Sequence, residues 1–434
     1  MFSSIFSTSA PVDPTARNLF PVSEAFRDNE LFGELEPKDT EWLCAGGFVT
    51  ETQIFYIAAD NGASVMCQVI HSAVGEIDVN LTGISLWYPT IQFVFKYYDP
   101  KTKKIIWKSV NVNNFVTPPP GLDKRSSKAD EFSITYKHTP GSDNPESYTI
   151  ISNLSADLQL SFTIVRPASA PGWKVGKGPK GGYTYLGPDT AKPEGYAIHR
   201  FWPHFRATGH LIHAGKAETL QGPGVMIHAI QGMRPNLLAA SWNFANFQSE
   251  QHGGVSAIQM EFKTCDSHGP KGAGSGGVWV NVGSLVIGGK LVTVTAETKY
   301  PNEEPVNNGV VSRTTHLNPI ADPHTGYNAP QQIRFEWQGP SILPDAPGTF
   351  KAKLEVDLGG LENPKGLIEK VDVLAEIPYA LKMAVNYLAG TKPYIYQWQN
   401  LVNLSITGPE SVVPGLSNGL EIAGVLFNEA SFIS

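Results

Sequence analysis

The run from His228 to Ser249, HAIQGMRPNLLAASWNFANFQS, combines polar groups that could bind a head group with aromatic side chains that could bind an apolar chain. Its amide and imidazole side chains are His228, Gln231, Asn243, Asn246 and Gln248. Burying such a group without a hydrogen-bond partner costs about 1–3 kcal/mol. We therefore expect an internal hydrogen-bond network or a bound ligand to satisfy these groups, in the interior of a β-barrel.

Aromatic side chains near these polar groups could form the wall of an apolar cavity. Such residues are more often part of a hydrophobic core than of a ligand site, and both interpretations stay open here. The candidate wall residues are Trp202, Trp242, Phe244, Phe247, Tyr394 and Tyr396. His228, Gln231 and Asn243 are the candidates for hydrogen bonds to an amide or hydroxyl group.

Other patterns that carry chemistry are weak. His204, His210 and His213 fall within ten residues, but on a strand His210 and His213 would face opposite sides, so we predict no metal site. The Gly-rich segments 177–182 and 269–277 precede no helical pattern, which argues against a phosphate loop. The sequence shows no nucleophile motif and predicts no cofactor. Acid–base catalysis by a buried carboxylate or histidine stays open, because burial sets the pKa.

Strand patterns dominate the chain and predict an all-β fold with a few short helices. Apolar and charged residues alternate over 351–358, and similar alternation occurs over 91–97 and 158–164. Gly288 and Gly289 separate two Val-rich runs, as in a two-residue hairpin. With 42 Gly and 33 Pro, the pattern is typical of antiparallel barrels or sandwiches.

Only one longer helix is predicted, beginning at Pro378 and ending at Gly390, with Leu381, Val385 and Leu388 at helical spacing. Long loops are common at the mouths of barrels. Segments rich in proline and glycine are predicted to be loops: 117–128, 266–277, 301–330 and 339–348.

The bulk composition narrows the function classes. The 434 residues suit two domains of roughly 200 residues each. A net charge of −7, with no basic patch evident in the sequence, argues against nucleic-acid binding. Three cysteines are too few and too scattered for a disulfide framework, and no apolar run reaches 18 residues. We therefore expect a cytoplasmic protein that does not span a membrane; the sequence does not indicate its oligomeric state.

The first residues could contact a membrane surface. Phe2, Ile5 and Phe6 have the i, i+3, i+4 spacing of a very short apolar helix face. No lysine or arginine precedes Arg17 to attract anionic lipids, and Pro11 limits the length of the helix. A frayed arm is the alternative interpretation.

Several segments together resemble the fungal survival factor 1 family. They are ETQIFYIAADNG at 51–62, FWPHFRATGHL at 201–211, the run 228–249, VDVLAEIP at 371–378 and AGTKPYIYQW at 389–398, followed by the closing EASFIS. The resemblance extends from about residue 41 to the C-terminus. It implies two consecutive lipocalin-like β-barrel domains, which agrees with the strand pattern.

The resemblance also implies a function and a division of the chain. Family membership implies a ceramide-binding carrier of sphingolipid precursors between endoplasmic reticulum and Golgi, linked to survival of oxidative stress and peripheral on those membranes. We expect an N-terminal arm at 1–40 and lipocalin-like domains at 41–205 and 206–434. The family's N-terminal membrane helix is matched here only by Met1-Phe2, and the loops 266–277 and 301–330 are longer than is usual in the family, as in a diverged paralogue.

A second class of function stays open. Fungal proteins with two lipocalin-like domains also include cofactor-free pericyclases, which position a polyene in an apolar cavity and need no covalent residue. Sequence motifs do not distinguish such a cavity from that of a lipid carrier. Our leading interpretation is the ceramide-like lipid carrier without enzyme activity, and the alternative is a cofactor-independent cyclase or isomerase.

Overall fold

The computed structural model describes residues 16–73, 77–79, 85–87, 89–270, 276–303, 309–376 and 392–433. Within this part of the chain almost all regular structure is β-strand, arranged as two large antiparallel sheets of lipocalin-like barrel type. The predicted all-β fold is confirmed. The helix predicted from Pro378 to Gly390 and the apolar face of Phe2, Ile5 and Phe6 lie outside the described residues.

The first sheet is built from strands in the first half of the chain. Its strands are β1 (Leu19–Phe20), β2 (Phe32–Glu34), β3 (Thr50–Ala58), β4 (Ser64–Ser72), β7 (Thr90–Asp99), β8 (Lys104–Asn111), β9 (Ser127–Lys128), β10 (Phe132–His138), β11 (Glu146–Ser155), β12 (Leu158–Arg166), β13 (Trp173–Val175), β14 (Tyr183–Leu186), β15 (Gly195–His213) and β16 (Lys216–Gln231). Beside it lie a small hairpin, β5 (Ile77–Val79) with β6 (Ser85–Trp87), and three 3-10 turns, η1 (Val22–Glu24), η2 (Asp28–Glu30) and η3 (Pro37–Asp39).

The second sheet follows the short helix α1 (Pro235–Leu238). Its strands are β17 (Ala239–Ser249), β18 (Val255–Thr264), β19 (Trp279–Ile287), β20 (Lys290–Lys299), β21 (Val311–Leu317), β24 (Gln332–Pro340), β25 (Thr349–Asp357), β26 (Leu367–Asp372), β27 (Tyr394–Thr407) and β28 (Leu420–Phe432). The remaining elements are the hairpin of β22 (Ile320–Ala321) and β23 (Asn328–Ala329), the turns η4 (Gln251–Gly253) and η5 (Leu416–Asn418), and α2 (Val373–Glu376).

The first barrel closes around an aromatic core. Its sheet runs in the order β8-β7-β4-β3-β16-β15-β12-β11-β10-β9, and Val116, which follows β8, exchanges two backbone hydrogen bonds with Lys128 of β9. Side chains alternate along each strand, so that Phe55 and Ile57 of β3 point into this barrel. Trp202 and Tyr148 are among the large side chains that fill its interior.

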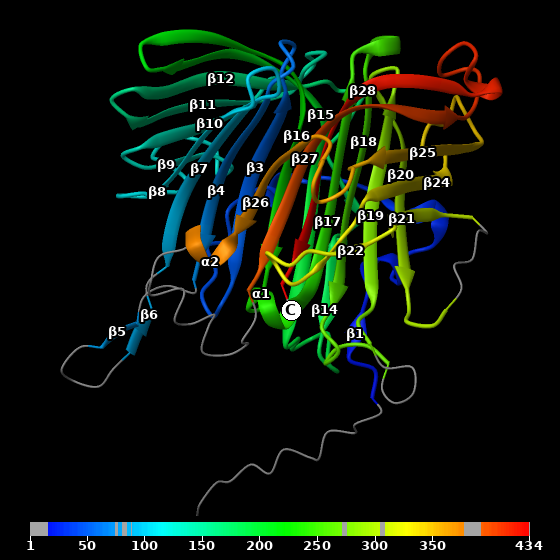
Figure 1. Ribbon diagram of the computed structural model, residues 1–434, viewed down its shortest axis with the longest axis horizontal. Coiled ribbons are helices and arrows are strands. Elements are labelled where there is room, and N and C mark those ends of the chain that lie inside the picture. Colours follow the sequence, from blue (N-terminus) through cyan, green and yellow to red (C-terminus); the bar gives the residue numbers. More distant parts are fainter. Residues whose placement is uncertain are drawn as a thin grey trace, which may run out of the picture.

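The second barrel closes in part through side chains. Its sheet runs in the order β20-β19-β18-β17-β28-β27-β25-β24-β21, and Thr295 of β20 donates a hydrogen bond to Ser312 of β21 at 2.9 Å. Phe335 and Trp337 of β24 belong to its core. Figure 1 shows the first sheet on the left and the second on the right, with β16, β17, β27 and β28 in the middle of the view.

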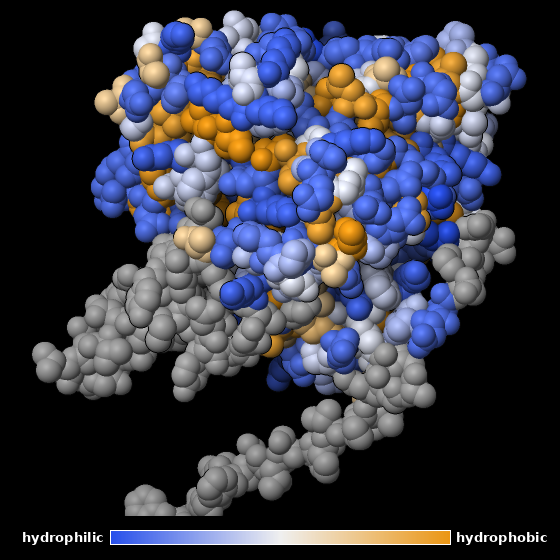
Figure 2. All heavy atoms as spheres, in the orientation of Figure 1, coloured by the Kyte–Doolittle hydropathy of each residue, from blue (hydrophilic) through white to orange (hydrophobic). Residues whose placement is uncertain are grey.

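The two barrels meet along a third apolar cluster, which we call the seam. Side chains on β3 and β16 that point away from the interior of the first barrel pack against the second barrel. These two strands are therefore buried on both faces. Seam residues are Ile54 and Tyr56 of β3, Val225 and Ile227 of β16, Phe244 of β17, Ile258 of β18 and Phe427 of β28. Apolar patches interrupt the mostly hydrophilic surface of the face drawn in Figure 2.

Several predictions from the sequence can be compared with these elements. The alternation over 351–358 corresponds to β25, and Gly288-Gly289 forms the β19–β20 turn with both residues at positive φ, as a two-residue hairpin requires. The prediction of a loop over residues 301–330 was wrong in part, since this segment contains strand β21. On β21 the side chains that face the barrel are polar, including Ser312 and Thr314, so the strand lacks apolar alternation.

The domain boundaries at residues 40/41 and 205/206 remain predictions. Strand pairing passes from the first sheet to the second between Gln231 and Ala239, and β15 runs through position 205. Residues 17–40 carry β1, β2 and η1–η3, and they contact the second barrel: the Ser23 and Thr298 hydroxyls form a hydrogen bond, and Tyr300 donates to Glu24 at 2.6 Å.

Candidate ligand pocket between the barrels

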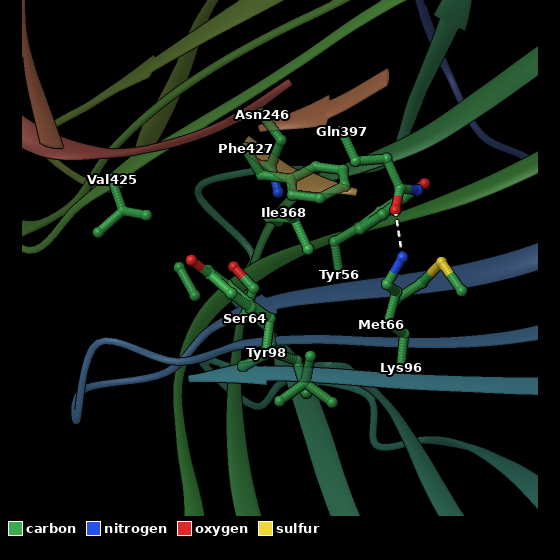
Figure 3. Close-up of a pocket in the computed structure, with 13 residues that line it drawn as sticks. Tyr56, Ser64, Met66, Lys96, Tyr98, Asn246, Ile368, Gln397, Val425 and Phe427 are labelled. Atoms are coloured by element: carbon green, nitrogen blue, oxygen red, sulfur yellow. Dashed lines mark hydrogen bonds between the residues drawn. The ribbon is translucent and has the colours of Figure 1, made fainter. Parts of the chain in front are cut away.

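A pocket lies in the seam and takes its walls from both barrels. The space inside it that a water molecule can reach is only about 20 Å³, well below the roughly 300–1,000 Å³ that is common for small-molecule sites, so the walls must move apart to admit a ligand. Its lining residues are Tyr56, Ile57, Ala58, Ser64, Val65, Met66, Lys96, Tyr98, Asn246, Ile368, Gln397, Val425 and Phe427. Figure 3 shows Ser64, Met66, Lys96 and Tyr98 on one side of the pocket and Asn246, Ile368, Gln397 and Phe427 on the other.

The register of the first sheet positions one wall. Tyr56 of β3 lies opposite Met66 of β4, and Met66 lies opposite Lys96 of β7. Residues directly opposite one another on antiparallel strands share a face of the sheet. These three side chains therefore form a row on the outer face of the first barrel, and Ser64 with Tyr98 begins the next row along.

The second barrel supplies the other wall through the pairing of β17, β28 and β27. Asn246 lies opposite Phe427, and Gln397 lies opposite Glu429. The Phe427 ring packs against Tyr56 across the seam, with ring centroids 5.2 Å apart. Because the walls come from strands far apart in sequence, the pocket exists only when both barrels are folded and in contact.

A cluster of charged and polar side chains lies at one end of the pocket. Lys96 Nζ donates to Gln397 Oε1 and to Glu369 Oε2, each at 2.5 Å, and Figure 3 shows the first of these bonds. Gln397 Nε2 donates in turn to Glu429 Oε1 at 2.5 Å. Burial raises the pKa of Glu429 above its ordinary value, although the amide of Gln397 and the charge of Lys96 act in the opposite direction.

The same end of the pocket contains a buried phenol. Burial raises the pKa of Tyr56 well above its usual value, and the negative charge of Glu429 adds to this effect. Tyr56 therefore stays neutral and can act as a hydrogen-bond donor or acceptor. Together with the primary amide of Gln397 and the ammonium of Lys96, it offers a polar ligand both donors and acceptors beside an apolar wall.

Polar contacts hold the barrels together around the pocket. Ser64 donates to Gln399 Oε1 at 2.6 Å, and Gln399 Nε2 donates to the Gly62 carbonyl at 2.7 Å. On another part of the seam, Arg206 bridges Asp60 of the first barrel and Glu250 of the second at 2.6 and 2.5 Å. These contacts fix the relative position of the two walls.

Trp202 and His228, two of the residues predicted for the site, face the interior of the first barrel. His228 shares a hydrogen bond of 2.7 Å with Glu51, and both side chains are fully buried. Burial alone would raise the pKa of Glu51, but the His228 hydrogen bond and charge and two backbone N–H groups lower it overall. Trp202 lies 5.0 Å from the Tyr148 ring, between centroids.

Four further predicted residues face the interior of the second barrel: Asn243, Phe247, Tyr394 and Tyr396. Asn243 donates to Glu261 at 2.9 Å and accepts from His316 at 2.8 Å. Tyr396 donates to Asp322 at 2.7 Å. Internal hydrogen bonds thus satisfy the Asn243 side chain, which corresponds to the network alternative of the sequence analysis.

Trp242 and Phe244 belong to the seam without lining its pocket. Trp242 packs against Phe262, 5.1 Å between ring centroids, and Phe244 packs against Tyr56 at 5.0 Å. Gln231 ends β16, and within the described residues its buried Oε1 has no hydrogen-bond partner. The structure therefore distributes the nine predicted residues over two barrel interiors and the seam, and none of them lines the seam pocket.

Sequence reasoning missed the pocket itself. The signal lay in strand segments that are apolar on both faces, such as Ile54 to Ile57 and Val225 to Ile227, because strands buried on both faces lose the alternation of polar and apolar residues. Such a segment indicates that a second layer covers the outer face of the barrel. Only Asn246, from the run 228–249, lines the pocket among the polar residues first noted.

Two negative findings concern the described residues alone. No helix in this part of the chain has the length and apolar character needed to cross a bilayer. Within the same residues, no three His, Cys, Asp or Glu side chains gather in an arrangement that could hold a metal ion.

The fold and the seam define a class of protein: two lipocalin-like barrels in tandem with a pocket between them. The chain belongs to the Svf1 family, whose model matches residues 2–434. This match begins well before residue 41, where the resemblance in the sequence was expected to start.

Curated relatives and a solved structure resemble most of the chain. A protein of Aspergillus fumigatus named ceramide-binding protein svf1 is 34% identical over 423 residues, covering 93% of this chain and 91% of the relative. Its namesake in Schizosaccharomyces pombe is 31% identical, covering 95% and 93%. The crystal structure of CghA with Sch210972 has the same fold, with a TM-score of 0.55, 11% identity, and 96% and 98% coverage.

Proposed function

We propose that the protein binds a ceramide-like lipid in the pocket between its barrels and shields it from water. The observation that carries this proposal is a pocket with an apolar wall and one polar end, formed by Tyr56, Met66 and Phe427 beside Lys96 and Gln397. Relatives that align with more than nine-tenths of this chain are named ceramide-binding proteins, which supports the same ligand class.

The chemistry of a ceramide matches the two ends of the pocket. Its amide and hydroxyl groups both donate and accept hydrogen bonds, as do the Gln397 amide and the Tyr56 phenol. Its hydrocarbon chains gain about 0.8 kcal/mol for each methylene removed from water. Apolar burial can therefore supply most of the affinity, while the few polar groups orient the head group.

A carrier role follows from this kind of binding. We infer that the protein moves such lipids between membranes of the endoplasmic reticulum and Golgi through the cytoplasm, in peripheral contact with both, and thereby contributes to survival under oxidative stress. Burial of an acyl chain in a seam that is open at its mouth permits loading and release without a chemical step. The proposed loading and release of lipid need no cofactor.

Native mass spectrometry of the protein purified from its own host tests the ligand class. We expect a co-purifying species with the mass of a ceramide or related long-chain lipid, identified after release by fragmentation. A cyclised polyketide or terpenoid in its place, or an empty protein that converts a polyene on incubation, would contradict the carrier and support the cofactor-independent cyclase or isomerase.

A further inference from the structure

The β7–β8 hairpin concentrates positive charge in a chain that is acidic overall. From Asp99 to Asn111 it reads DPKTKKIIWKSVN, with four lysines against one aspartate, whereas the whole chain carries a net charge of −7. Lys101, Lys103 and Lys104 at its turn are exposed. We expected no basic patch in this chain, and that expectation was wrong at this hairpin. A short local cluster of lysines does not show in the overall net charge.

Asp99, the one carboxylate in this segment, is used to build the turn. It accepts hydrogen bonds from the Lys101 backbone N–H at 2.9 Å and from the Thr102 hydroxyl at 2.7 Å. The Asp99 carboxylate is therefore occupied by hydrogen bonds within the turn. The ammonium groups of the turn lysines lie beyond it. Lys104 Nζ lies 3.3 Å from His213 Nδ1, a contact that does not neutralise its charge.

Two apolar side chains are exposed on the same hairpin. Ile105 and Trp107 are 37% and 41% exposed, on β8, the strand at the end of the first sheet. Lysines on an edge strand protect it from pairing with other strands. That role would account for the lysines, but it gives no reason for an exposed tryptophan and isoleucine beside them.

Strand register connects these apolar side chains to the pocket. Trp107 lies opposite Lys96, and Ile105 lies opposite Tyr98; Lys96 and Tyr98 both line the pocket. Opposed residues share a face, and neighbouring strands are about 4.8 Å apart. The row Tyr56, Met66, Lys96 and Trp107 thus runs from the interior of the pocket across β3, β4, β7 and β8 to the surface.

We propose that the β7–β8 hairpin is a docking surface for anionic membranes that brings the mouth of the pocket to the lipid surface. Lysines near an anionic bilayer attract it, and tryptophan prefers the interface between head groups and acyl chains. The combination of exposed lysines with an adjacent Trp and Ile fits that interface, and the row that ends at Trp107 places the pocket beside it. The proposal of membrane docking stands on these residues; its purpose as a loading surface rests on the proposed function.

Vesicle binding of the full chain tests the docking surface. The decisive variant is Lys101→Glu with Lys103→Glu. Its matched control is Lys290→Glu with Lys351→Glu, which reverses the charge of two exposed lysines on the second barrel. On vesicles of phosphatidylcholine with about one-third phosphatidylserine, we expect the hairpin variant to lose binding at least about tenfold, since each lysine contributes about fivefold. The control variant should bind like the wild type, and added salt should reduce the difference.

A second variant reports insertion of the hairpin. Brominated lipids quench tryptophans that reach the bilayer, and Trp107→Phe should remove the lipid-dependent part of the quenching while retaining the fold, because the side chain is partly exposed. Equal vesicle binding of the two charge-reversed variants would overturn the proposal, as would unchanged quenching in Trp107→Phe. Binding of the hairpin to a polynucleotide, with vesicle binding unaffected by the substitutions, would instead assign the lysines to nucleic acid.

These outcomes are separable from the proposed function. None of the substituted residues lines the pocket, so lipid supplied in solution should load the hairpin variants as well as the wild type when measured by native mass spectrometry. Loss of membrane binding with normal loading supports the docking surface. Normal membrane binding without any lipid loading would contradict the proposed function and leave the docking surface standing.

Discussion

The interior of the first barrel and the seam between the barrels both combine aromatic rings with buried polar groups, but they treat those groups differently. In the barrel interior Glu51 is held by His228 and by the Leu43 and Cys44 backbone N–H groups, all on the first barrel. In the seam, Lys96 of one barrel depends on Gln397 and Glu369 of the other. The barrel interior therefore stabilises its own fold, whereas the seam creates a surface that neither barrel has alone.

The largest effect that separates the two regions is expected from Glu51→Gln. The new amide would place an NH2 group against backbone N–H donors, or leave them unpaired, in a fully buried position. We expect a loss of about 3 kcal/mol in the free energy of unfolding, measured by urea denaturation. Because the pKa of Glu51 is lowered in the folded protein, the stability it contributes is present above the unfolded pKa and is lost as the pH falls.

The folded fraction of Glu51→Gln should still load lipid with the affinity of the wild type, since Glu51 lies outside the pocket. A large loss of affinity in protein that remains folded would show that the barrel interior takes part in binding.

His199 allows a test of how dry the seam is. It packs against Trp242 and Phe262, 5.7 and 6.4 Å between ring centroids, and burial lowers its pKa to about 4. The unfolded chain takes up a proton near pH 6.5, which the folded chain does not, so stability falls between pH 7 and 5, by up to about 2 kcal/mol. His199→Leu should lack this part of the pH dependence.

Urea denaturation at several pH values measures the effect. The exposed His210→Gln, on the same strand, is the control and should retain the pH dependence of the wild type. An identical decline from pH 7 to 5 in His199→Leu and wild type would mean that water reaches this part of the seam.

Met66→Trp addresses the pocket directly. Met66 stands in the middle of the lining row between Tyr56 and Lys96, so a larger ring would occupy the space assigned to the lipid. We expect about tenfold weaker ceramide binding, equivalent to about 1.4 kcal/mol, in a titration with a fluorescent ceramide.

Overpacking by itself costs about 1–3 kcal/mol of stability, which calls for a comparison. Ala257→Leu overpacks the interior of the second barrel, where Ala257 is fully buried, and should leave binding unchanged. Equal weakening by both substitutions would mean that general destabilisation, and not occupation of the pocket, explains the result.

The smallest effect on ceramide affinity is expected from Trp242→Ala. Trp242 belongs to the seam but lies outside the pocket lining, so we predict a change in ceramide affinity of less than about threefold, together with a loss of stability from the truncated ring. The same titration measures it. A loss of tenfold or more would restore Trp242 to the ligand wall proposed from the sequence.

Local patterns in the sequence were sufficient for the strands but not for the pocket. The alternation that predicts β25 reports one dry and one wet face, and Gly288-Gly289 reports its own turn. Tyr56 and Phe427, by contrast, meet across more than 300 positions, and each is an ordinary apolar residue on its own strand. No spacing rule connects them, since their contact depends on how the two barrels pack.

The polar residues first noted in the run 228–249 illustrate the same limit. The run was correctly expected to contain buried polar groups that need partners, and Asn243, Asn246 and Gln248 do find internal ones. The sequence could not show that this segment crosses from β16 to β17 and so serves two barrels and the seam. The polar side chains of this one continuous segment are therefore spread over different parts of the fold, and their role in ligand binding stays a prediction.

Photocrosslinking with a ceramide that carries a diazirine in its acyl chain, followed by peptide mapping, locates the bound lipid. We expect labelled peptides from both sides of the seam, one containing Tyr56 or Met66 and one containing Val425 or Phe427, with labelling reduced by Met66→Trp. Labelling confined to peptides of one barrel interior, around Tyr148 and Trp202 or around Tyr394 and Tyr396, would contradict a ligand site between the barrels.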